Sequence, residues 1–429
     1  MKHKDTEVAS LGACRHDSPL RIPRFIDDGA RVIADVEYER VLQSFRETGS
    51  ALSFENAGPR RKIFFDPAKT KAAIVTCGGL CPGLNNVIKS LVENLYYQYG
   101  VKDIVGVPFG YEGLIPSYGH GFIPLVPNGV EDIHEKGGSI LGSSRGMQDV
   151  PAMVDTLERE RIDILFTIGG DGTFHGSHEL FLETQRRKLP ISIAGIPKTI
   201  DNDINFVDRT FGFSTAVSIA TMAMKGAHAE ATGARNGIGL VKVMGRDSGF
   251  IAAYTALASN VANYVLIREV PFALDGPEGL LAHLEKRLEE QRHAVILVAE
   301  GAGQEFFQDA KGTDASGNVK YGDIGLYLKD RITGHFKARK FHANLKYIDP
   351  SYIIRSMPAA PDDAVFCIML AQNAVHGAMA GKSGFMVGRW ANYFTFMPLP
   401  VAISKRKMVE HDGYLWSIVR EATGQPDFA

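Results

Sequence analysis

Two stretches of the sequence decide the fold: DILFTIGGDGT at residues 163–173 and PISIAGIPKTIDND at residues 190–203. Each contains an apolar run of strand length that ends in glycine or polar residues, and HGSHELFLETQRRK separates the two runs. Strands that alternate with helices at this spacing form βαβ units, because the helix returns the chain to the edge where the next parallel strand begins. The two stretches therefore predict a mostly parallel sheet.

The same pattern recurs on both sides of these stretches. AAIVTC (72–77) is followed by GGLCPG and a segment of helical spacing, and DIVGVPFGYEGL (103–114) comes next. Further rounds begin with IGLVKVMG (238–245) and AVILVAEG (294–301). We therefore expect an α/β fold with two Rossmann-like three-layer domains, each built on a mostly parallel sheet. Charges and prolines before residue 71 predict an irregular N-terminal extension, and the polar stretch 304–321 predicts an exposed loop.

Composition and charge exclude several classes of protein. The chain has 429 residues, of which 45% are hydrophobic and 22% are charged, as in globular domains rather than disordered or collagen-like chains. Its 47 basic and 49 acidic residues give a net charge of −2, so no global basic field attracts nucleic acid or an anionic membrane. Any site for an anionic ligand must therefore be built locally.

The N-terminus and the cysteines indicate the compartment. Residues 1–20 carry charges but no apolar core of a signal peptide, and nowhere do about 18 uncharged apolar residues run together. Cys77 and Cys81 lack the second pair of ligands that would complete a zinc site. We therefore expect reduced thiols in a cytoplasmic protein without a membrane span.

Two glycine-rich segments at strand ends are candidate phosphate sites. In GGDGT (169–173) a carboxylate stands among glycines at the edge where open α/β sheets bind ligands. Asp171 can hold Mg²⁺ while Thr173 and the flanking amides face phosphates; the alternative is a turn aspartate bonded to its own backbone. Gly78 and Gly79 let backbone amides approach an anion, and a simple tight turn is the alternative there.

TIDND (199–203) offers a hydroxyl and two carboxylates after another strand. Asp201 and Asp203 are two residues apart, so in extended or turning backbone their side chains project to the same side. Neighbouring carboxylates repel unless they take different roles, such as a general base and a metal-linked group. A polar turn that caps a helix is the alternative.

Eight segments together resemble the 6-phosphofructokinase family. In the family's order they are GGLCPGLNNVI (78–88), GYEGL (110–114), GGSILGSSRG (137–146), GGDGT (169–173), PKTIDND (197–203), MGRDSGF (244–250), AEG (299–301) and YIDPSYIIRS (347–356). NAD kinases and lipid kinases share GGDGT alone, whereas PKTIDND with MGR is specific to phosphofructokinases. The preceding GPRRKIFFDP (58–67) resembles the lead-in of the longer plant-type and trypanosomatid-type ATP-dependent members.

The resemblance implies a phosphofructokinase fold and phosphorylation of fructose 6-phosphate to fructose 1,6-bisphosphate with MgATP, the committed step of glycolysis. It also implies a division of the chain into an N-terminal extension (1–70), an ATP-binding domain (71–213 with about 355–404) and a fructose 6-phosphate-binding domain (214–354 with 405–429). Three alternatives stay open: a pyrophosphate-dependent phosphotransferase acting on the same sugar, an NAD or lipid kinase of the GGDGT type, and a catalytically silent regulatory subunit.

The resemblance also implies roles for individual residues. Asp201 would be the general base for the sugar 1-hydroxyl, with Thr199 and Arg246 as further catalytic residues and with Mg²⁺ held by Asp171 and Asp203. Contacts to the nucleotide are expected from Gly78, Gly79, Tyr111, Arg145, Gly146, Gly170, Asp171, Gly172 and Thr173. Contacts to fructose 6-phosphate are expected from Thr199, Ile200, Asp201, Met244, Gly245, Arg246, Glu300, Lys346, Tyr352, Ile353, Ile354 and Arg355.

Gly172 and Lys198 bear on the identity of the phosphoryl donor. In the family, a glycine at the fourth position of GGDGT leaves room for the α-phosphate of ATP, whereas pyrophosphate users carry an aspartate there. Lys198 is typical of pyrophosphate users, but plant-type and trypanosomatid-type ATP enzymes share it. The combination in this chain therefore resembles that of the ATP-dependent members.

Family sites are built at subunit contacts, so the resemblance implies an allosteric enzyme that is a homotetramer or, next, a homodimer. Tyr352 stands where many bacterial members have a histidine, and Lys346 and Gly237 stand where they have arginines that reach in from the neighbouring subunit. Arg235 is close enough in sequence to substitute for the second arginine, but its position favours the alternative, an ordinary surface arginine. The basic cluster 405–407 predicts a solvated face, with an effector-phosphate site as the alternative.

Overall fold

The computed structural model describes residues 3–307, 312 and 320–428. Most of the polar stretch 304–321 lies outside these residues. The chain folds into two compact units, here called unit 1 (Met1–Thr199, Ile204–Gly212 and Ser356–Arg406) and unit 2 (Ile200–Asp203, Phe213–Arg355 and Lys407–Ala429). The chain therefore passes from one unit to the other inside the TIDND segment.

Unit 1 is built on a nine-stranded sheet. From edge to edge its strands are β3 (Arg31–Ile33), β4 (Ser53–Asn56), β17 (Tyr393–Pro398), β16 (Phe385–Trp390), β10 (Ser192–Pro197), β9 (Ile164–Gly169), β6 (Lys71–Thr76), β7 (Asp103–Val107) and β8 (Ile123–Pro124). The five strands from β16 to β7 run parallel, which confirms the expected βαβ arrangement for the centre of the sheet. The outer strands pair antiparallel. Between β16 and β17 the two-residue turn Ala391-Asn392, with both φ angles positive, returns the chain directly to its neighbour.

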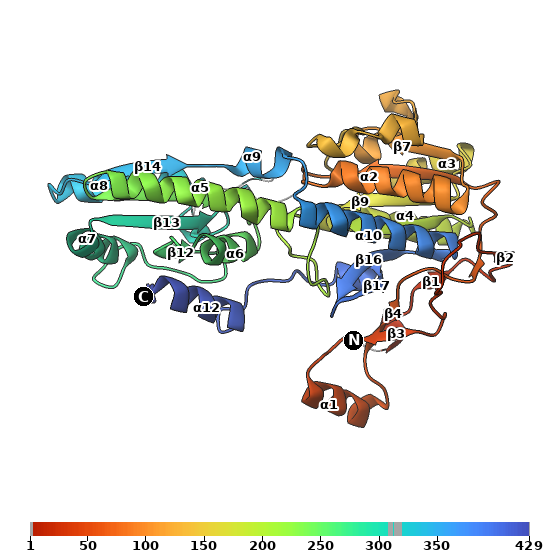
Figure 1. The fold of residues 1–429 in the computed structure, drawn as a ribbon, viewed down its shortest axis with the longest axis horizontal. Helices are drawn as coiled ribbons and strands as arrows, with labels where there is room; N and C mark the ends of the chain where they lie inside the picture. The colour runs from red at the N-terminus through yellow and green to blue at the C-terminus, as the bar shows by residue number, and fades with distance from the viewer. Residues whose placement is uncertain (1–2, 308–311, 313–319, 429) are drawn as a thin grey trace. The chain divides into compact units, whose positions relative to one another are not determined.

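Helices cover both faces of this sheet. On one face α2 (Leu84–Glu93) packs beside α10 (Pro361–Met379), as Figure 1 shows. On the other face α3 (Val150–Arg159) and α4 (Asp171–Arg186) pack against alternate strand residues such as Ala73. Successive residues of a strand point to opposite faces, and strands with both faces covered are apolar throughout. This explains why β9 and β10 are continuous apolar runs.

The first 70 residues are part of unit 1 rather than a separate body. The hairpin of β3 and β4 extends the main sheet beyond β17, while α1 (Tyr38–Thr48) has no buried residue. Two further strand pairs join β1 (Ala9–Ser10) to β15 (Lys382–Ser383) and β2 (His16–Asp17) to β5 (Lys62–Ile63). The sequence predicts an irregular extension here, because these strands are too short for a period of two to be visible.

Unit 2 contains a four-stranded sheet in which all pairs are parallel. Its order is β12 (Tyr264–Leu266), β13 (His293–Ala299), β11 (Gly237–Val243) and β14 (Asn344–Ile348). One face carries α7 (Leu280–Gln291) and α8 (Ile324–Ala338), and the other carries α5 (Phe213–Gly233) and α6 (Phe250–Ser259). The expected three-layer α/β architecture is thus confirmed in this unit as well.

Gly237 determines how α5 packs in unit 2. A Cβ atom at this position would lie 2.1 Å from the carbonyl oxygen of Ala231 on α5. No larger residue fits at this position without moving that helix. The nearby Arg235 is exposed to solvent.

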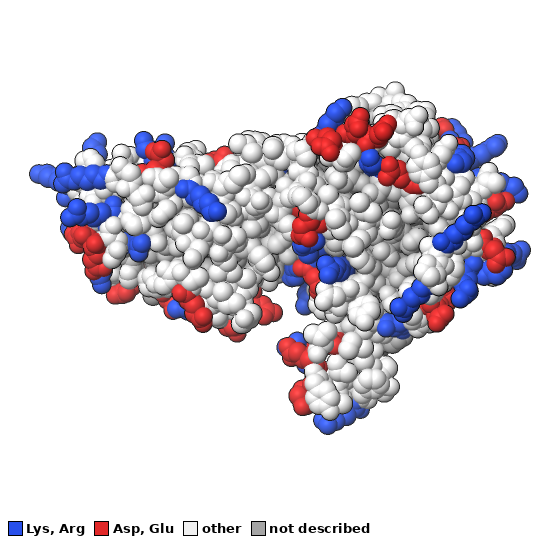
Figure 2. Space-filling view, in the orientation of Figure 1, with Lys and Arg blue, Asp and Glu red and all other residues white. Residues whose placement is uncertain are grey.

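The remaining elements are short. They are η1 (His3–Thr6), η2 (Asn94–Tyr99, a π-helix that continues α2), η3 (Gly110–Leu114), η4 (Pro116–Tyr118), η5 (Pro127–Val130), η6 (Ile133–Glu135), η7 (Gln304–Phe306), α9 (Ser351–Ser356), α11 (Leu399–Ala402) and α12 (Tyr414–Thr423). None of the helices in the described residues is both long and apolar enough to cross a membrane. On the face drawn in Figure 2, basic and acidic side chains are interspersed rather than gathered in one basic patch.

His376 gives the fold of unit 1 a dependence on pH. Its Nδ1 atom lies 2.8 Å from the hydroxyl of Tyr99, and burial together with the charge of Arg60 lowers the pKa of the imidazole to about 4. The unfolded chain binds the proton near pH 6.5, so stability falls as pH drops through that value towards about 4. We expect urea denaturation to give a free energy of unfolding about 2 kcal/mol lower at pH 5 than at pH 7 through this group. His376→Gln should remove that part of the slope, and an unchanged slope would contradict the assignment.

Candidate active site

The glycine-rich segments of unit 1 meet at the carboxyl edge of its parallel strands. GGLCPG follows β6, GYEGL follows β7 and GGDGT follows β9, three strands that are neighbours in the sheet. The amide of Gly78 donates to the carbonyl of Ser144 at 2.9 Å, and the Ser143 hydroxyl donates to the carbonyl of Gly78 at 2.6 Å. The segment 137–146 is thereby fixed against the first glycine loop. Phosphate-binding loops in α/β proteins occupy this edge of the sheet.

Lys198 connects two of these loops. Its backbone amide donates to the carbonyl of Gly169 at 2.8 Å, and its Nζ atom donates to the carbonyl of Gly79 at 2.6 Å. Gly78 has a positive φ of 85°, and a Cβ atom there would lie 3.1 Å from the same Nζ atom. The side chain is buried, so the cation stands within the glycine loop. The result is a local positive charge at a backbone site suited to an anion.

The GGDGT segment turns from strand into helix at a point where space is limited. A Cβ atom at Gly169 would lie 2.0 Å from the Thr173 hydroxyl oxygen, so only glycine allows this close approach. Helix α4 begins at Asp171, and its first amides are directed at the space beyond the strand ends. A helix N-terminus of this kind stabilises phosphate groups.

Tyr111 supports the first turn of this helix from the protein interior. Its hydroxyl donates to the carbonyl of Thr173 at 2.8 Å and lies 3.0 Å from the Ser177 hydroxyl. The side chain is only 3% exposed. The buried ring packs against the start of α4 and holds the GGDGT turn in place. The contact between Tyr111 and the nucleotide stays a prediction.

Asp171 pairs with a residue that the sequence patterns missed. The Arg406 guanidinium lies 3.2 Å from one carboxylate oxygen of Asp171, and His175 lies 3.7 Å from the other. Arg406 belongs to the basic cluster 405–407; its side chain is 35% exposed and pairs with Asp171 at the start of α4. An isolated antiparallel bridge between Ile204 and Arg406 brings the distant segment to the site. No local pattern indicates such a pairing.

Three of the other predicted nucleotide contacts of unit 1 face solvent: Arg145, Gly146 and Gly172. Arg145 and Gly146 are exposed, and a Cβ atom at Gly79 would lie 3.4 Å from the Arg145 guanidinium. Gly172 is also exposed, and nothing lies within 4 Å of the position that its Cβ would occupy. The structure therefore leaves open space at Gly172, the position expected to discriminate between donors.

The TIDND segment is held at three backbone carbonyls. That of Thr199 accepts from the Thr210 hydroxyl at 2.5 Å, in unit 1. Those of Asp201 and Asp203, in unit 2, accept from the Ser248 hydroxyl and from the Lys407 amide, each at 2.9 Å. Because Thr199 and Asp201 are two residues apart, the chain keeps their Cα atoms within about 7 Å.

Predicted sugar-site residues of unit 2 gather at the ends of three neighbouring parallel strands. Met244–Arg246 follows β11, Glu300 follows β13, and the segment that leads into α9 follows β14. The Gly301 amide donates to the carbonyl of Gly245 at 3.2 Å, and a Cβ atom at Gly301 would lie 2.0 Å from the carbonyl oxygen of Arg246. The first two segments are therefore in direct contact.

Charges of both signs surround Glu300. Burial raises the pKa of its carboxyl group, and the positive charges of Lys242, Arg246 and Arg355 act in the opposite direction. The Arg246 guanidinium lies over the Tyr321 ring, 4.6 Å from its centre, and the Arg355 guanidinium lies 4.7 Å from the centre of the Tyr352 ring. Stacked guanidinium groups keep their donors in fixed directions, which suits phosphate oxygens.

Two of the residues predicted to contact the sugar have buried side chains. The side chains of Ile200 and Ile354 are 5% and 0% exposed, so a substrate could meet only their backbone atoms. In the six-residue helix α9, neighbouring side chains point in different directions, and Tyr352 and Ile353 are exposed while Ile354 faces the core. Lys346 is exposed on β14.

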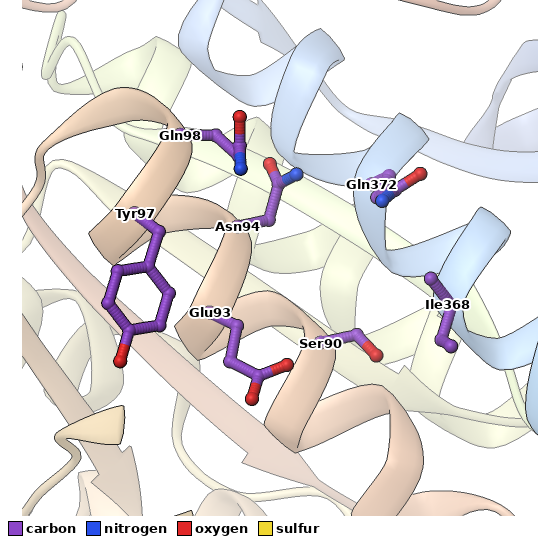
Figure 3. Close-up of a pocket in the computed structure, with 7 residues that line it drawn as sticks. All are labelled: Ser90, Glu93, Asn94, Tyr97, Gln98, Ile368 and Gln372. Atoms are coloured by element: carbon purple, nitrogen blue, oxygen red, sulfur yellow. The ribbon is translucent and has the colours of Figure 1, made fainter. Parts of the chain in front are cut away.

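A pocket of about 320 Å³ lies elsewhere on unit 1, between α10 and the segment of α2 and η2 (Figure 3). Its lining residues are Ser90, Glu93, Asn94, Tyr97, Gln98, Ile368 and Gln372. None of the predicted site residues lines it, and its lining includes no Lys or Arg side chain that could attract a phosphate. It is therefore not part of the candidate site.

Comparison with known proteins identifies the family. The family model described as phosphofructokinase matches residues 71–378. The chain belongs to the phosphofructokinase family. It is 50% identical over 98% of its length, and 97% of the relative's, to the ATP-dependent 6-phosphofructokinase of Borreliella burgdorferi. It is 48% identical to the ATP-dependent 6-phosphofructokinase of Amycolatopsis methanolica, over 98% of this chain and 95% of that one.

Solved phosphofructokinase structures share the fold. The pyrophosphate-dependent phosphofructokinase of Marinobacter aquaeolei matches with a TM-score of 0.67 and 19% identity, over 84% of this chain and 92% of that one. An identity this low supports the architecture alone. The phosphofructokinase fold expected from the motifs is thus confirmed, together with membership of the family.

Tyr111 gives a test of how the GGDGT turn is supported in this phosphofructokinase. Tyr111→Phe removes a buried hydroxyl and one of the donors to the Thr173 carbonyl, so we expect the free energy of unfolding to fall by about 1 to 2 kcal/mol. Urea denaturation monitored by circular dichroism measures the loss. The matched control is Tyr118→Phe, at a position 49% exposed, which should change stability by less than about 0.5 kcal/mol. Equal effects would contradict the supporting role.

Proposed function

We propose that this chain transfers a phosphoryl group from MgATP to the 1-hydroxyl of fructose 6-phosphate, forming fructose 1,6-bisphosphate in glycolysis. The observation that carries the proposal is the near-full-length identity of about half to relatives named ATP-dependent 6-phosphofructokinase. The anion site at the glycine loops of unit 1 and the arginine-rich site of unit 2 supply the groups that such a transfer needs.

Unit 1 binds the nucleotide in this proposal. The backbone amide of Gly79 and those at the start of α4 receive the phosphates, and the buried Lys198 adds a positive charge between the two loops. Gly78 leaves room for the Lys198 ammonium group, while its own amide is bonded to Ser144. Arg145 and Gly146 lie at the solvent side of the same loops. Preorganised donors of this kind stabilise charge without reorganisation during the reaction.

Mg²⁺ fits this site as a metal that arrives with the nucleotide. Within the described residues, no three His, Cys, Asp or Glu side chains form a group that could hold an ion by themselves. Mg²⁺, however, keeps several waters and is bound through one or two carboxylates plus substrate phosphates. Asp171, with a third of its side chain exposed at the start of α4, would be one ligand, and Asp203 would be the second. The bound ion would neutralise phosphate charge.

Asp201 acts as the general base in this proposal, and Thr199 and Arg246 position the group that is transferred. The backbone bond from Ser248 holds Asp201, and the chain itself holds Thr199 two residues away. In unit 2, Arg246, Arg355 and the exposed Tyr352 receive the sugar phosphate, and Glu300 accepts hydrogen bonds from sugar hydroxyls. Met244, Gly245, Lys346 and Ile353 complete the predicted contacts.

The role of Asp201 predicts a specific loss of rate. Asp201→Asn keeps the shape of the side chain but removes its basicity, so turnover should fall by about 10²- to 10⁴-fold. A coupled assay with fructose 6-phosphate and MgATP measures turnover, and calorimetry should find the affinity for fructose 6-phosphate little changed. Turnover close to that of the wild type would remove Asp201 from this role.

The donor rests on Gly172. Pyrophosphate is the second candidate, because Lys198 is present, and comparing turnover with ATP and with pyrophosphate decides between them. Gly172→Asp should lower kcat/KM for ATP by at least about 100-fold, since a carboxylate about 4 Å from a phosphate costs several kcal/mol at a reduced dielectric. The position is exposed in the first turn of α4, where acidic residues are favourable, so the variant should fold.

The control for this experiment is Gly172→Ala. It adds a methyl group in open space without charge and should keep most of the ATP activity. Equal losses in both variants would attribute the effect to bulk instead of charge. Wild-type activity with pyrophosphate and none with ATP would overturn the choice of donor.

We also propose that the active form is a homotetramer, or else a homodimer, located in the cytoplasm and subject to allosteric control. Family sites are shared between subunits, and the exposed Lys346 and Arg235 are the cations that a neighbouring copy could receive. Light scattering of the active enzyme should give a mass of four times, or twice, 46.8 kDa. A fully active monomer would reject the assembly.

A further inference from the structure

Lys242 is a buried cation on the central strand of unit 2. It lies on β11, on the face that also carries Ile238 and Leu240 towards α7 and α8, and it is 9% exposed. Its Nζ atom lies 2.9 Å from a carboxylate oxygen of Asp323 and 2.9 Å from one of Asp349. Lys242 lies in the strand segment IGLVKVMG (238–245), whose pattern predicts no role for it in a site, and its two partners come from distant parts of the chain.

Each partner uses its second oxygen to begin a helix. The Oδ1 atom of Asp323 accepts from the Leu326 amide at 3.1 Å and caps α8. The Oδ1 atom of Asp349 accepts from the amide and hydroxyl of Ser351, at 3.1 and 2.5 Å, at the start of α9. The lysine therefore anchors two helix starts through the two carboxylates.

Helix α9 depends on this anchor more than α8 does. It has only six residues, far fewer than an isolated helix needs for stability, whereas α8 has 15 and packs into the core. α9 carries Tyr352 and Arg355, which we assign to the sugar phosphate. Without the lysine, Asp323 and Asp349 would face each other as like charges, and Asp349 would be pushed away from Ser351.

Lys242 also acts on Glu300, the carboxylate at the end of the neighbouring strand β13. Burial raises the pKa of the Glu300 carboxyl group, and the positive charge of Lys242 opposes this rise, as do those of Arg246 and Arg355. Burial alone would lower the pKa of Lys242, but its hydrogen bonds to Asp349 and Asp323 outweigh burial and raise it. The lysine is thus a permanent cation between the segments that carry Arg355 and Glu300.

We propose that Lys242 is a positioning residue for sugar-phosphate binding: through Asp349 it fixes α9 and the direction of Arg355, and it holds Glu300 beside them. This role rests on the proposed function of unit 2 as the fructose 6-phosphate site. Lys242 does not touch the substrate in this scheme. Its effect is on the Michaelis constant for the sugar, because misplacing a phosphate-binding arginine by about 1 Å can cost up to 10²-fold.

The test begins with the wild-type chain, which must turn over fructose 6-phosphate with MgATP. In Lys242→Met we expect KM for fructose 6-phosphate to rise by at least about 10-fold while KM for ATP changes less than about 2-fold. Lys242→Arg keeps the charge and should recover part of the affinity. Asp349→Asn should reproduce the Lys242→Met effect. The double variant should have a KM for fructose 6-phosphate no higher than that of the more severe single variant, because both substitutions act through one contact.

Asp323→Asn is the matched control. This variant removes the charge of the other carboxylate that pairs with Lys242. Asp323 caps α8, which carries no predicted substrate contact, so the variant should lower the melting temperature and leave KM for fructose 6-phosphate unchanged. If Lys242→Met fails to fold, Asp349→Asn and Asp323→Asn still separate the two roles.

Two results would overturn the proposal. One is that Lys242→Met and Asp349→Asn raise the KM values for both substrates together, or lower only the melting temperature. The other is that the effects of the two substitutions on KM for fructose 6-phosphate are fully additive in the double variant. Absence of turnover in the wild type would instead reject the proposed function itself, and the role of Lys242 with it. The two failures are therefore distinguishable.

Discussion

The unit 1 site depends on the contact between the Lys198 side chain and the first glycine loop. Lys198 lies one residue after β10. Its amide donates to the carbonyl of Gly169 and its ammonium group to the carbonyl of Gly79, so it connects loops that follow three neighbouring strands. Burying an ammonium group is costly unless it is hydrogen-bonded, and the glycine carbonyl supplies that bond. The glycines are required because their side chains would occupy the space of the lysine and of Thr173. The position of the Lys198 charge therefore depends on the glycines that leave space for it.

Unit 2 uses a buried lysine at the same level of its sheet in a different way. Lys242 lies one residue before the end of the central strand β11, and both of its partners are carboxylates instead of carbonyls. Two carboxylates offset its charge and convert it into an anchor for helix starts. The parallel strands of both sheets thus place a lysine near their carboxyl ends, one beside the expected phosphates and one behind the residues predicted to meet the sugar.

Much of the candidate site could be predicted because its chemistry is local in sequence. GGLCPG, GGDGT and TIDND each follow an apolar strand, and parallel strands present their carboxyl ends at one edge. The roles of Asp201, Arg246 and Glu300 stay predictions. Tyr111 and Ile354 lie in the predicted motifs, but their side chains are buried. Burial could not be predicted, because it depends on what packs against them from elsewhere in the chain.

The sequence by itself determined the α/β class, the family and the loops that carry the glycines and carboxylates, because strand and turn preferences act over a few residues. Only the tertiary structure decided that β3 and β4 of the N-terminal segment extend the main sheet, that Arg406 pairs with Asp171, and that Lys242 joins Asp323 to Asp349. These contacts bring together residues far apart in the chain. Their energies depend on distance and burial, quantities that no local pattern contains, and they exist only once the strands and helices have packed.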